Sequence, residues 1–172
     1  MDRQSEAQGC RHSPSLGRQE TRENMNGRPS RSFHILLVED NDGDSFLFRR
    51  ALKNSAFSVH AHIVPGAKEF SDLIRPSEKK VRQFVPDLIV LDLGLPGEDG
   101  YEVLRTIKTD PDLKVIPVVV FTGSDAPEGV RRAYELGANS YIAKKIGYEE
   151  LQRSVNAMLE FWLGLASLPT EL

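Results

Sequence analysis

The stretch from Val85 to Gly100 constrains the fold of this chain more than any other. Its first part, Asp87 to Leu91, is a short and almost wholly apolar run, which is typical of a strand buried on both faces in the middle of a parallel sheet. The run ends in a carboxylate, Asp92, and the Gly and Pro residues that follow prevent the strand from continuing. Open α/β sheets bind ligands at the carboxyl ends of such strands, although an acid that merely caps a loop gives the same pattern.

Three further apolar runs end in polar groups, which favours the ligand-binding interpretation. Residues 33–38 precede Glu39 and Asp40, residues 116–121 precede Thr122, and residues 139–143 precede Lys144. The carboxyl ends of parallel strands meet at one edge of a sheet. We therefore expect three carboxylates, a hydroxyl and an ammonium group to lie together at that edge.

The apolar periodicity predicts five strand–helix units. The expected strands are 33–38, 57–64, 87–91, 116–121 and 139–143, and the expected helices are about 42–55, 66–74, 98 or 99 to 109, 126–136 and 148 to beyond 165. Asp42 is the expected N-cap of the first helix, and the last helix carries an apolar stripe that ends with Trp162 and Leu165. Residues 76–85 form a charged connector. Short connections and right-handed crossovers then predict a doubly wound α/β fold with a five-stranded parallel sheet.

Two histidines, His60 and His62, share the less apolar face of the second expected strand. Histidines at this spacing can bind a metal ion, but no third ligand is apparent near them in the sequence. The pair is therefore interpreted as part of an exposed or covered strand face.

Composition excludes several classes of protein. The chain has 172 residues, 40% of them hydrophobic and 27% charged, with a formal net charge of −3, so it has no overall basic footprint for nucleic acid. No apolar run approaches the roughly 20 residues that span a bilayer, and the N-terminus lacks the apolar region of a secretory signal, so we expect no such signal. The one cysteine, Cys10, cannot form an internal disulfide, and we expect a cytoplasmic protein.

The first 32 residues differ in composition from the rest. They contain few hydrophobic residues, so we expect a disordered polar extension over 1–32 and a single folded domain over 33–172. Met25 raises the hypothesis of a later translation start.

The polar groups at the expected sheet edge suggest a particular chemistry. The carboxylates of Glu39, Asp40 and Asp92 repel one another unless a cation lies among them, and Mg²⁺ is the common hard cation for oxygen ligands. A carboxylate beside such an ion, with Lys144 nearby, suits attack on a phosphoryl donor. Thr122 is then a candidate switch residue that hydrogen-bonds a phosphoryl oxygen.

The spacing of these residues resembles the receiver domains of two-component response regulators. Thr122, Tyr141 and Lys144 lie 30, 49 and 52 residues after Asp92, the paired acids follow the first strand, and an Asp-x-x-Leu-Pro motif begins at Asp92. The resemblance extends from about Phe33 to the C-terminus and implies a flavodoxin-like fold.

The resemblance also implies a role for each metal-site residue. Asp92 accepts a phosphoryl group from a sensor histidine kinase. Asp40, Asp92 and the backbone carbonyl of Gly94 bind Mg²⁺ directly, and Glu39 acts through water.

Signal output is implied in the same way. Lys144 pairs with the phosphoryl group, Thr122 moves toward this group, and the Tyr141 side chain turns inward behind Thr122. The face of the fourth helix, fifth strand and fifth helix is then remodelled for a partner protein that the sequence does not identify.

Three segments resemble the small single-domain response regulators that pair with bacterial phytochromes: Glu39-Asp40-Asn41, residues 110–122, and Phe161-Trp162-Leu163. This resemblance implies a phytochrome as the sensor kinase and a homodimer through the fourth and fifth helices. Phe161 and Trp162 point about 100° apart on a helix, so we expect one of them to be partly exposed.

Lys145 stands where the family usually has a proline in a cis bond, and we expect a trans bond because a cis bond without proline is costly. This departure supports one alternative, a pseudo-receiver that binds partners without phosphate. A second alternative is a phosphohydrolase with an aspartyl-phosphate intermediate, but Gly94 stands where those enzymes have a second acid. We expect a phosphoacceptor with at most self-dephosphorylation, and no enzyme.

Overall fold

The computed structural model describes residues 31–74, 85–97 and 99–169. Most of the predicted N-terminal extension and of the predicted charged connector lies outside these residues.

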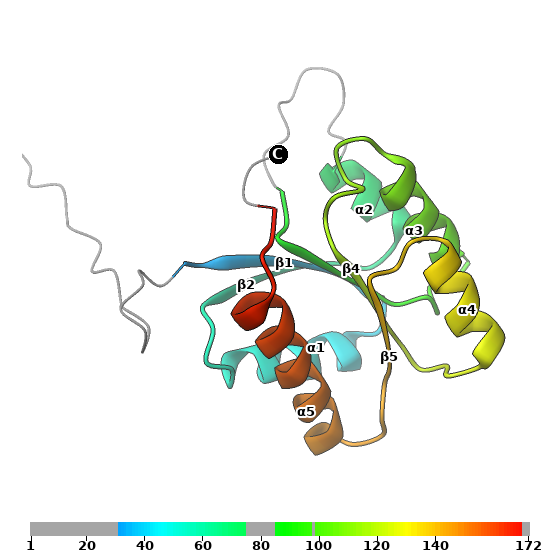
Figure 1. Cartoon of the computed structure of the whole chain (residues 1–172). Coiled ribbons are helices and arrows are strands. Elements are labelled where there is room, and N and C mark those ends of the chain that lie inside the picture. Colours follow the sequence, from blue (N-terminus) through cyan, green and yellow to red (C-terminus); the bar gives the residue numbers. More distant parts are fainter. Residues whose placement is uncertain (1–30, 75–84, 98, 170–172) are drawn as a thin grey trace, which may run out of the picture. The chain divides into compact units, whose positions relative to one another are not determined.

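The described chain contains one five-stranded parallel sheet (Figure 1). Its strands are β1 (Phe33–Val38), β2 (Val59–Val64), β3 (Leu88–Leu91), β4 (Val118–Thr122) and β5 (Ser140–Ala143). They pair in the order β2-β1-β3-β4-β5, which confirms the predicted doubly wound α/β fold. All four residues of β3 are buried, as a strand in the middle of a parallel sheet requires.

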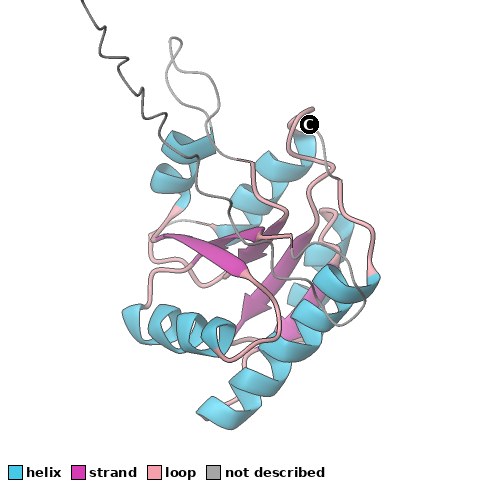
Figure 2. Ribbon diagram, turned by 90° about the vertical axis from the view of Figure 1, so that its left-hand side faces the viewer, coloured by secondary structure: helices cyan, strands magenta, loops and turns pink. Residues whose placement is uncertain are grey.

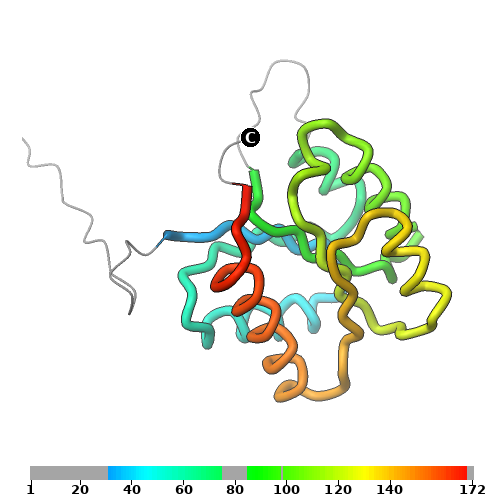
Figure 3. Tube along the Cα trace, in the orientation of Figure 1, coloured from blue at the N-terminus to red at the C-terminus, as the bar shows by residue number. Residues whose placement is uncertain are grey.

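Helices cover both faces of the sheet (Figure 2). They are α1 (Asp42–Lys53), α2 (Ala67–Ile74), α3 (Gly100–Thr109), α4 (Pro127–Glu135) and α5 (Tyr148–Leu159). The apolar sides of α1 and α5 pack on one face, and those of α2, α3 and α4 pack on the other. Figure 3 shows α1 and α5 side by side, although almost a hundred residues separate them.

The ends of several elements differ from the predictions by one or two residues, with identifiable causes. The N-cap of α1 is Asn41 and not Asp42, because the extended backbone of Asn41 lets its side chain accept a hydrogen bond from the Asp44 backbone nitrogen at 3.0 Å. β4 begins at Val118 because Pro117 has no N–H to donate to the sheet. Asn139 precedes β5, and its side chain accepts a hydrogen bond from the Val118 backbone nitrogen at 2.9 Å.

The last helix does not continue as a regular α-helix. After Leu159 it becomes a π-helix, η1 (Glu160–Leu165), whose wider turn changes the direction of each following side chain. Leu163 is therefore buried, whereas Leu165, which was predicted to belong to the apolar stripe, is 81% exposed. Phe161 is 52% exposed and its ring lies edge-on to that of Trp162, so the expected partial exposure is confirmed, and a role of this exposed ring at an interface stays a prediction.

The sheet register adds a third histidine to the predicted pair. β1 and β2 are neighbours, and His34 lies directly opposite His60. Sequence reasoning did not place His34 there, because it considered one strand without its neighbour, but the three histidines do not form a group of ligand atoms within 4.8 Å of one another among the described residues.

None of the helices within the described residues is long and apolar enough to cross a membrane.

Candidate functional site

The carboxyl ends of four parallel strands bring the predicted site residues to one edge of the sheet. Glu39 follows β1, Asp92 follows β3, Thr122 ends β4 and Lys144 follows β5. The backbone nitrogen of Lys144 donates to the Thr122 carbonyl at 2.7 Å, which positions the lysine beside β4. Glu39, Asp92 and Thr122 are all buried, although each carries a polar side chain.

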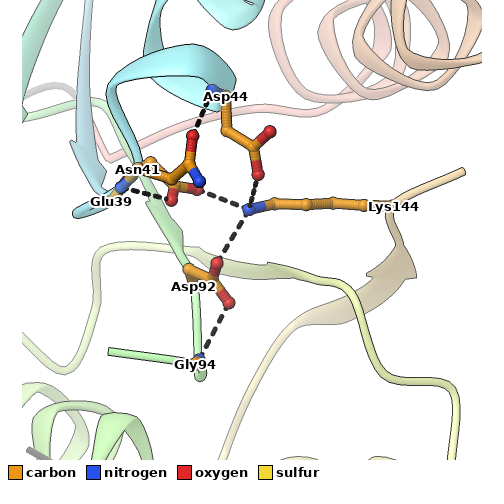
Figure 4. A network of polar contacts seen from close by, with 6 residues as sticks. All are labelled: Glu39, Asn41, Asp44, Asp92, Gly94 and Lys144. Atoms are coloured by element: carbon orange, nitrogen blue, oxygen red, sulfur yellow. Dashed lines mark hydrogen bonds and ion pairs between the residues drawn. The ribbon is translucent and has the colours of Figure 1, made fainter. Parts of the chain in front are cut away.

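The Lys144 ammonium group is the centre of this site (Figure 4). It donates to Glu39 Oε2 at 2.5 Å, to Asp92 Oδ2 at 2.7 Å and to Asp44 Oδ2 at 2.8 Å. One cation therefore faces three carboxylates, so these four side chains carry a formal charge of −2. Such an excess of negative charge at a largely buried position favours a further cation.

Asp44 is the residue that sequence reasoning missed. It lies in the first turn of α1, and the Asn41 cap holds the backbone of this turn over the site. Its side chain is 37% exposed, so it reaches the ammonium group from the solvent side. The sequence signal that could have identified Asp44 is an acid a few residues after the paired acids, at the start of an amphipathic helix that begins at the sheet edge.

Opposing effects set the protonation of these groups. Burial by itself raises the pKa of Asp92, but hydrogen bonds from the Gly94 backbone nitrogen, Lys144 and Thr122 outweigh it and hold the pKa below its usual value. Burial also raises the pKa of Glu39, and there the bonds from Lys144 and Asn41 do not fully compensate. For Lys144, burial lowers the pKa, but the three carboxylates raise it above its ordinary value.

The loop after β3 shapes the acceptor side of the site. The Gly94 backbone nitrogen donates to Asp92 Oδ1 at 2.9 Å, which leaves the two carboxylate oxygens of Asp92 with different partners. Asp99 caps α3 by accepting from the Tyr101 backbone nitrogen. A side chain at Gly100 would lie 2.5 Å from the Leu93 backbone, so only glycine permits this close return of the loop.

Three carboxylates are placed to share a cation. Oxygen atoms of Glu39, Asp44 and Asp92 lie within 4.8 Å of one another. This all-oxygen donor set fits a hard divalent ion such as Mg²⁺. Asp40 is half-buried next to Glu39 but is not a member of this group among the described residues.

The predicted switch residues lie on the β4 and β5 side of the site. Thr122 lies beside Asp92 and helps to lower the pKa of that carboxyl group. Tyr141 is half-buried, and its hydroxyl donates to the Ser124 carbonyl at 2.8 Å. Burial, with the nearby Tyr101 and Asp125, raises the pKa of Tyr141, so the hydroxyl keeps the proton that it donates.

The peptide bond between Lys144 and Lys145 is trans, as expected without a proline. Lys145 is exposed and does not take the place of Lys144 among the carboxylates.

Comparison with known proteins identifies the family. A family model for the response regulator receiver domain matches residues 35–156. The probable methanogenesis regulatory protein FilR2 of Methanothrix harundinacea is 41% identical over 132 residues, which cover 77% of this chain and 84% of that protein. Response regulator Rcp1 of Synechocystis is 39% identical over 135 residues, which cover 78% of this chain and 92% of that protein.

Solved structures agree. The phosphorylated cyanobacterial phytochrome response regulator RcpA has 40% sequence identity and a TM-score of 0.76, over 81% of this chain and 100% of that chain. The Mn²⁺-bound form of Rcp1 has 38% identity and a TM-score of 0.74, over 80% of this chain and 99% of that chain. This chain therefore belongs to the response regulator receiver domain family.

Proposed function

We propose that this response regulator accepts a phosphoryl group on Asp92 from a sensor histidine kinase, in a Mg²⁺-dependent reaction, and thereby changes a protein-binding surface. The observation that supports this most strongly is the arrangement around the Lys144 ammonium group, which joins the Asp92 carboxylate to two further acids. The low pKa of Asp92 keeps it ionised and therefore nucleophilic.

The transfer is a substitution at phosphorus. A carboxylate oxygen of Asp92 forms a bond to phosphorus while the bond from phosphorus to the kinase histidine nitrogen breaks. The electron pair of that bond stays on the imidazole nitrogen, which takes up a proton. Lys144 keeps its proton throughout, because its pKa is raised, and it donates to the oxygens of the incoming group.

The metal ligands are assigned as follows. Asp40, Asp92 and the Gly94 carbonyl hold Mg²⁺ directly and Glu39 acts through water, as in the family pattern. Asp44 joins this set from α1, since its carboxylate lies with those of Glu39 and Asp92. When bound, Mg²⁺ supplies positive charge that stabilises the phosphoryl oxygens during transfer.

Phosphorylation changes the hydrogen bonds of Thr122 and Tyr141. The Thr122 hydroxyl lies beside Asp92 and lowers its pKa, and a phosphoryl oxygen on Asp92 becomes the acceptor of this hydroxyl. Tyr141 now bonds the Ser124 carbonyl on the loop before α4, so its inward turn breaks a bond that holds this loop. Both changes alter the face formed by α4, β5 and α5, which we assign to partner binding and to a homodimer.

We propose a phytochrome as the sensor kinase. This rests on the 40% identity to RcpA, which is a cyanobacterial phytochrome response regulator. We also propose that this response regulator is located in the cytoplasm. Self-dephosphorylation by water is the one catalytic activity we assign to the protein.

Intact mass spectrometry after incubation with acetyl phosphate tests the proposal. We expect one added phosphoryl group in the presence of Mg²⁺, none with a chelator, and none in Asp92→Asn. Glu135→Gln on the exposed end of α4 is the control and keeps the adduct. An adduct that survives in Asp92→Asn would overturn the assignment. If no adduct forms under any condition, failure to bind beryllofluoride shows a receiver that signals without phosphate.

A further inference from the structure

A cluster of three histidines lies away from the phosphorylation site. His34 of β1 is paired in register with His60 of β2, and His62 lies two residues further along β2, so the three side chains lie on the same face of the sheet. The ring centroid of His34 is 5.3 Å from that of His60 and 5.6 Å from that of His62.

The distance between two ring nitrogens is informative. His34 Nδ1 and His62 Nε2 are 3.4 Å apart, which is beyond the usual range of about 2.7–3.2 Å for a good N–H hydrogen bond. Zinc binds imidazole nitrogen at about 2.0–2.1 Å, so two nitrogens on one tetrahedral ion lie roughly 3.3–3.4 Å apart. This separation is that of a long hydrogen bond between the two rings in the metal-free protein, and it also equals the spacing of two nitrogen ligands on one tetrahedral ion.

His60 provides the third imidazole. Its ring stacks on that of His34 at an interplanar angle of 24°, and its side chain is exposed. Ligation by His60 would require rotation of this exposed side chain about its own bonds, because the three histidines do not all place ligand nitrogens within 4.8 Å of one another in this structure. Three imidazoles leave a fourth tetrahedral position for water or another ligand.

The cluster is separate from the phosphorylation site. His34 is the second residue of β1, and Glu39 lies five residues later, just after the strand's carboxyl end. At about 3.3 Å per residue, these positions are roughly 16 Å apart along the strand. The two sites also differ in chemistry, since imidazole nitrogens select borderline transition metals and carboxylate oxygens select Mg²⁺.

We propose that His34, His60 and His62 form a binding site for a divalent transition-metal ion of the Zn²⁺ type, which links the edge strand β2 to β1. Because the ligands come together only in the folded sheet, bound metal stabilises the fold.

Titration calorimetry of the full chain with Zn²⁺, in an excess of Mg²⁺ that occupies the carboxylates, tests the proposal. We expect one site, and a loss of affinity of more than about 100-fold in His60→Ala and in His62→Ala, since even outer-shell partners of a metal ligand are worth 10–100-fold. His12→Ala is the matched control for the remaining histidine and keeps the site. Zn²⁺ also raises the Tm of the unmutated protein but not that of His60→Ala.

Unchanged Zn²⁺ affinity in His60→Ala and His62→Ala would overturn the proposal, as would an equal loss in His12→Ala. Because the His60 side chain is exposed, its removal leaves the fold intact, which circular dichroism checks. Phosphorylation of Asp92 by acetyl phosphate is expected to be the same in His60→Ala. The phosphorylation assay and the Zn²⁺ titration are separate measurements, so failure of the metal site does not imply failure of the phosphorylation site.

Discussion

At the residue scale, Lys144 determines how the site is held together without a bound metal ion. Its ammonium group is the shared partner of Glu39, Asp44 and Asp92, and its side chain is only 11% exposed. Removal of one partner from a buried ionic group is costly because it leaves the remaining charges unpaired. In the metal-free protein, Lys144 thus supplies part of the positive charge that a divalent cation supplies when it is bound.

We therefore predict that Lys144→Gln lowers the free energy of unfolding in a chelator by about 3 kcal/mol, the lower end of the range for a broken buried pair. Added Mg²⁺ restores part of the loss, because it supplies the missing positive charge. Urea unfolding with and without Mg²⁺ measures both effects. The exposed neighbour in Lys145→Gln is the control and changes stability by less than about 0.5 kcal/mol. Equal losses in the two variants would contradict this account.

Asp44 and Asp42 form a second matched pair, since both are acids in the first turn of α1 and only Asp44 reaches Lys144. We predict that Asp44→Asn weakens Mg²⁺ binding by about 10-fold, the lower end of the effect of partners that support a metal site. Asp42→Asn, on the exposed side of the turn, leaves the affinity unchanged within error. Calorimetric titration with Mg²⁺ compares them, and identical affinities would exclude Asp44 from the site.

At the scale of elements, Lys108 joins α3 to the segment before β4 and to the segment before β5. Its ammonium group donates to the Ile116 carbonyl at 2.8 Å, to Asn139 Oδ1 at 2.9 Å and to the Lys114 carbonyl at 3.3 Å. These acceptors are uncharged, so burial is not offset by a carboxylate, and it lowers the pKa of Lys108 to about 8.

This pKa predicts a pH dependence of stability. Between about pH 8 and the ordinary lysine value of 10.5, the unfolded chain binds the proton more strongly than the folded one. The contribution of Lys108 to the free energy of unfolding therefore becomes more positive, and the fold more stable, as the pH rises through this interval. The difference between the unmutated protein and Lys108→Met, followed by urea unfolding from pH 7 to 10.5, isolates that contribution. A difference that does not change with pH would refute it.

At the scale of the whole molecule, the C-terminal end of the fold exposes large apolar groups. Phe161 and Leu165 lie in the π-helix and are 52% and 81% exposed. Apolar groups gathered at a surface are typical of contact sites. Both residues follow α5, which is one of the three elements of the proposed dimer face.

We predict that beryllofluoride with Mg²⁺ shifts the unmutated protein to a dimer in light-scattering chromatography. Phe161→Ser raises the dimer dissociation constant by at least about 10-fold, which corresponds to the loss of roughly 1.4 kcal/mol at a contact. Phe46→Ser, at a phenylalanine on α1 that is 63% exposed, is the control and leaves the dimer unchanged. A monomer in every condition, or equal effects of the two substitutions, would overturn the dimer proposal.

The sequence alone determined the fold class and most of the site. Each apolar run followed by a polar group marks where a strand ends, and this information is local, so it needs no knowledge of the neighbours. The offsets from Asp92 to Thr122, Tyr141 and Lys144 added the family. Parallel pairing then makes the gathering of these groups unavoidable, because all such strands end at one edge.

The tertiary structure alone decided which side chains from remote segments meet. The placement of β2 beside β1 brought His34 opposite His60, and the cap at Asn41 aimed the turn that carries Asp44 toward Lys144. Likewise the π-turn after Leu159 buried Leu163 in place of Leu165. Strand register, cap geometry and the width of a helical turn result from packing between distant segments, and local periodicity does not contain that information.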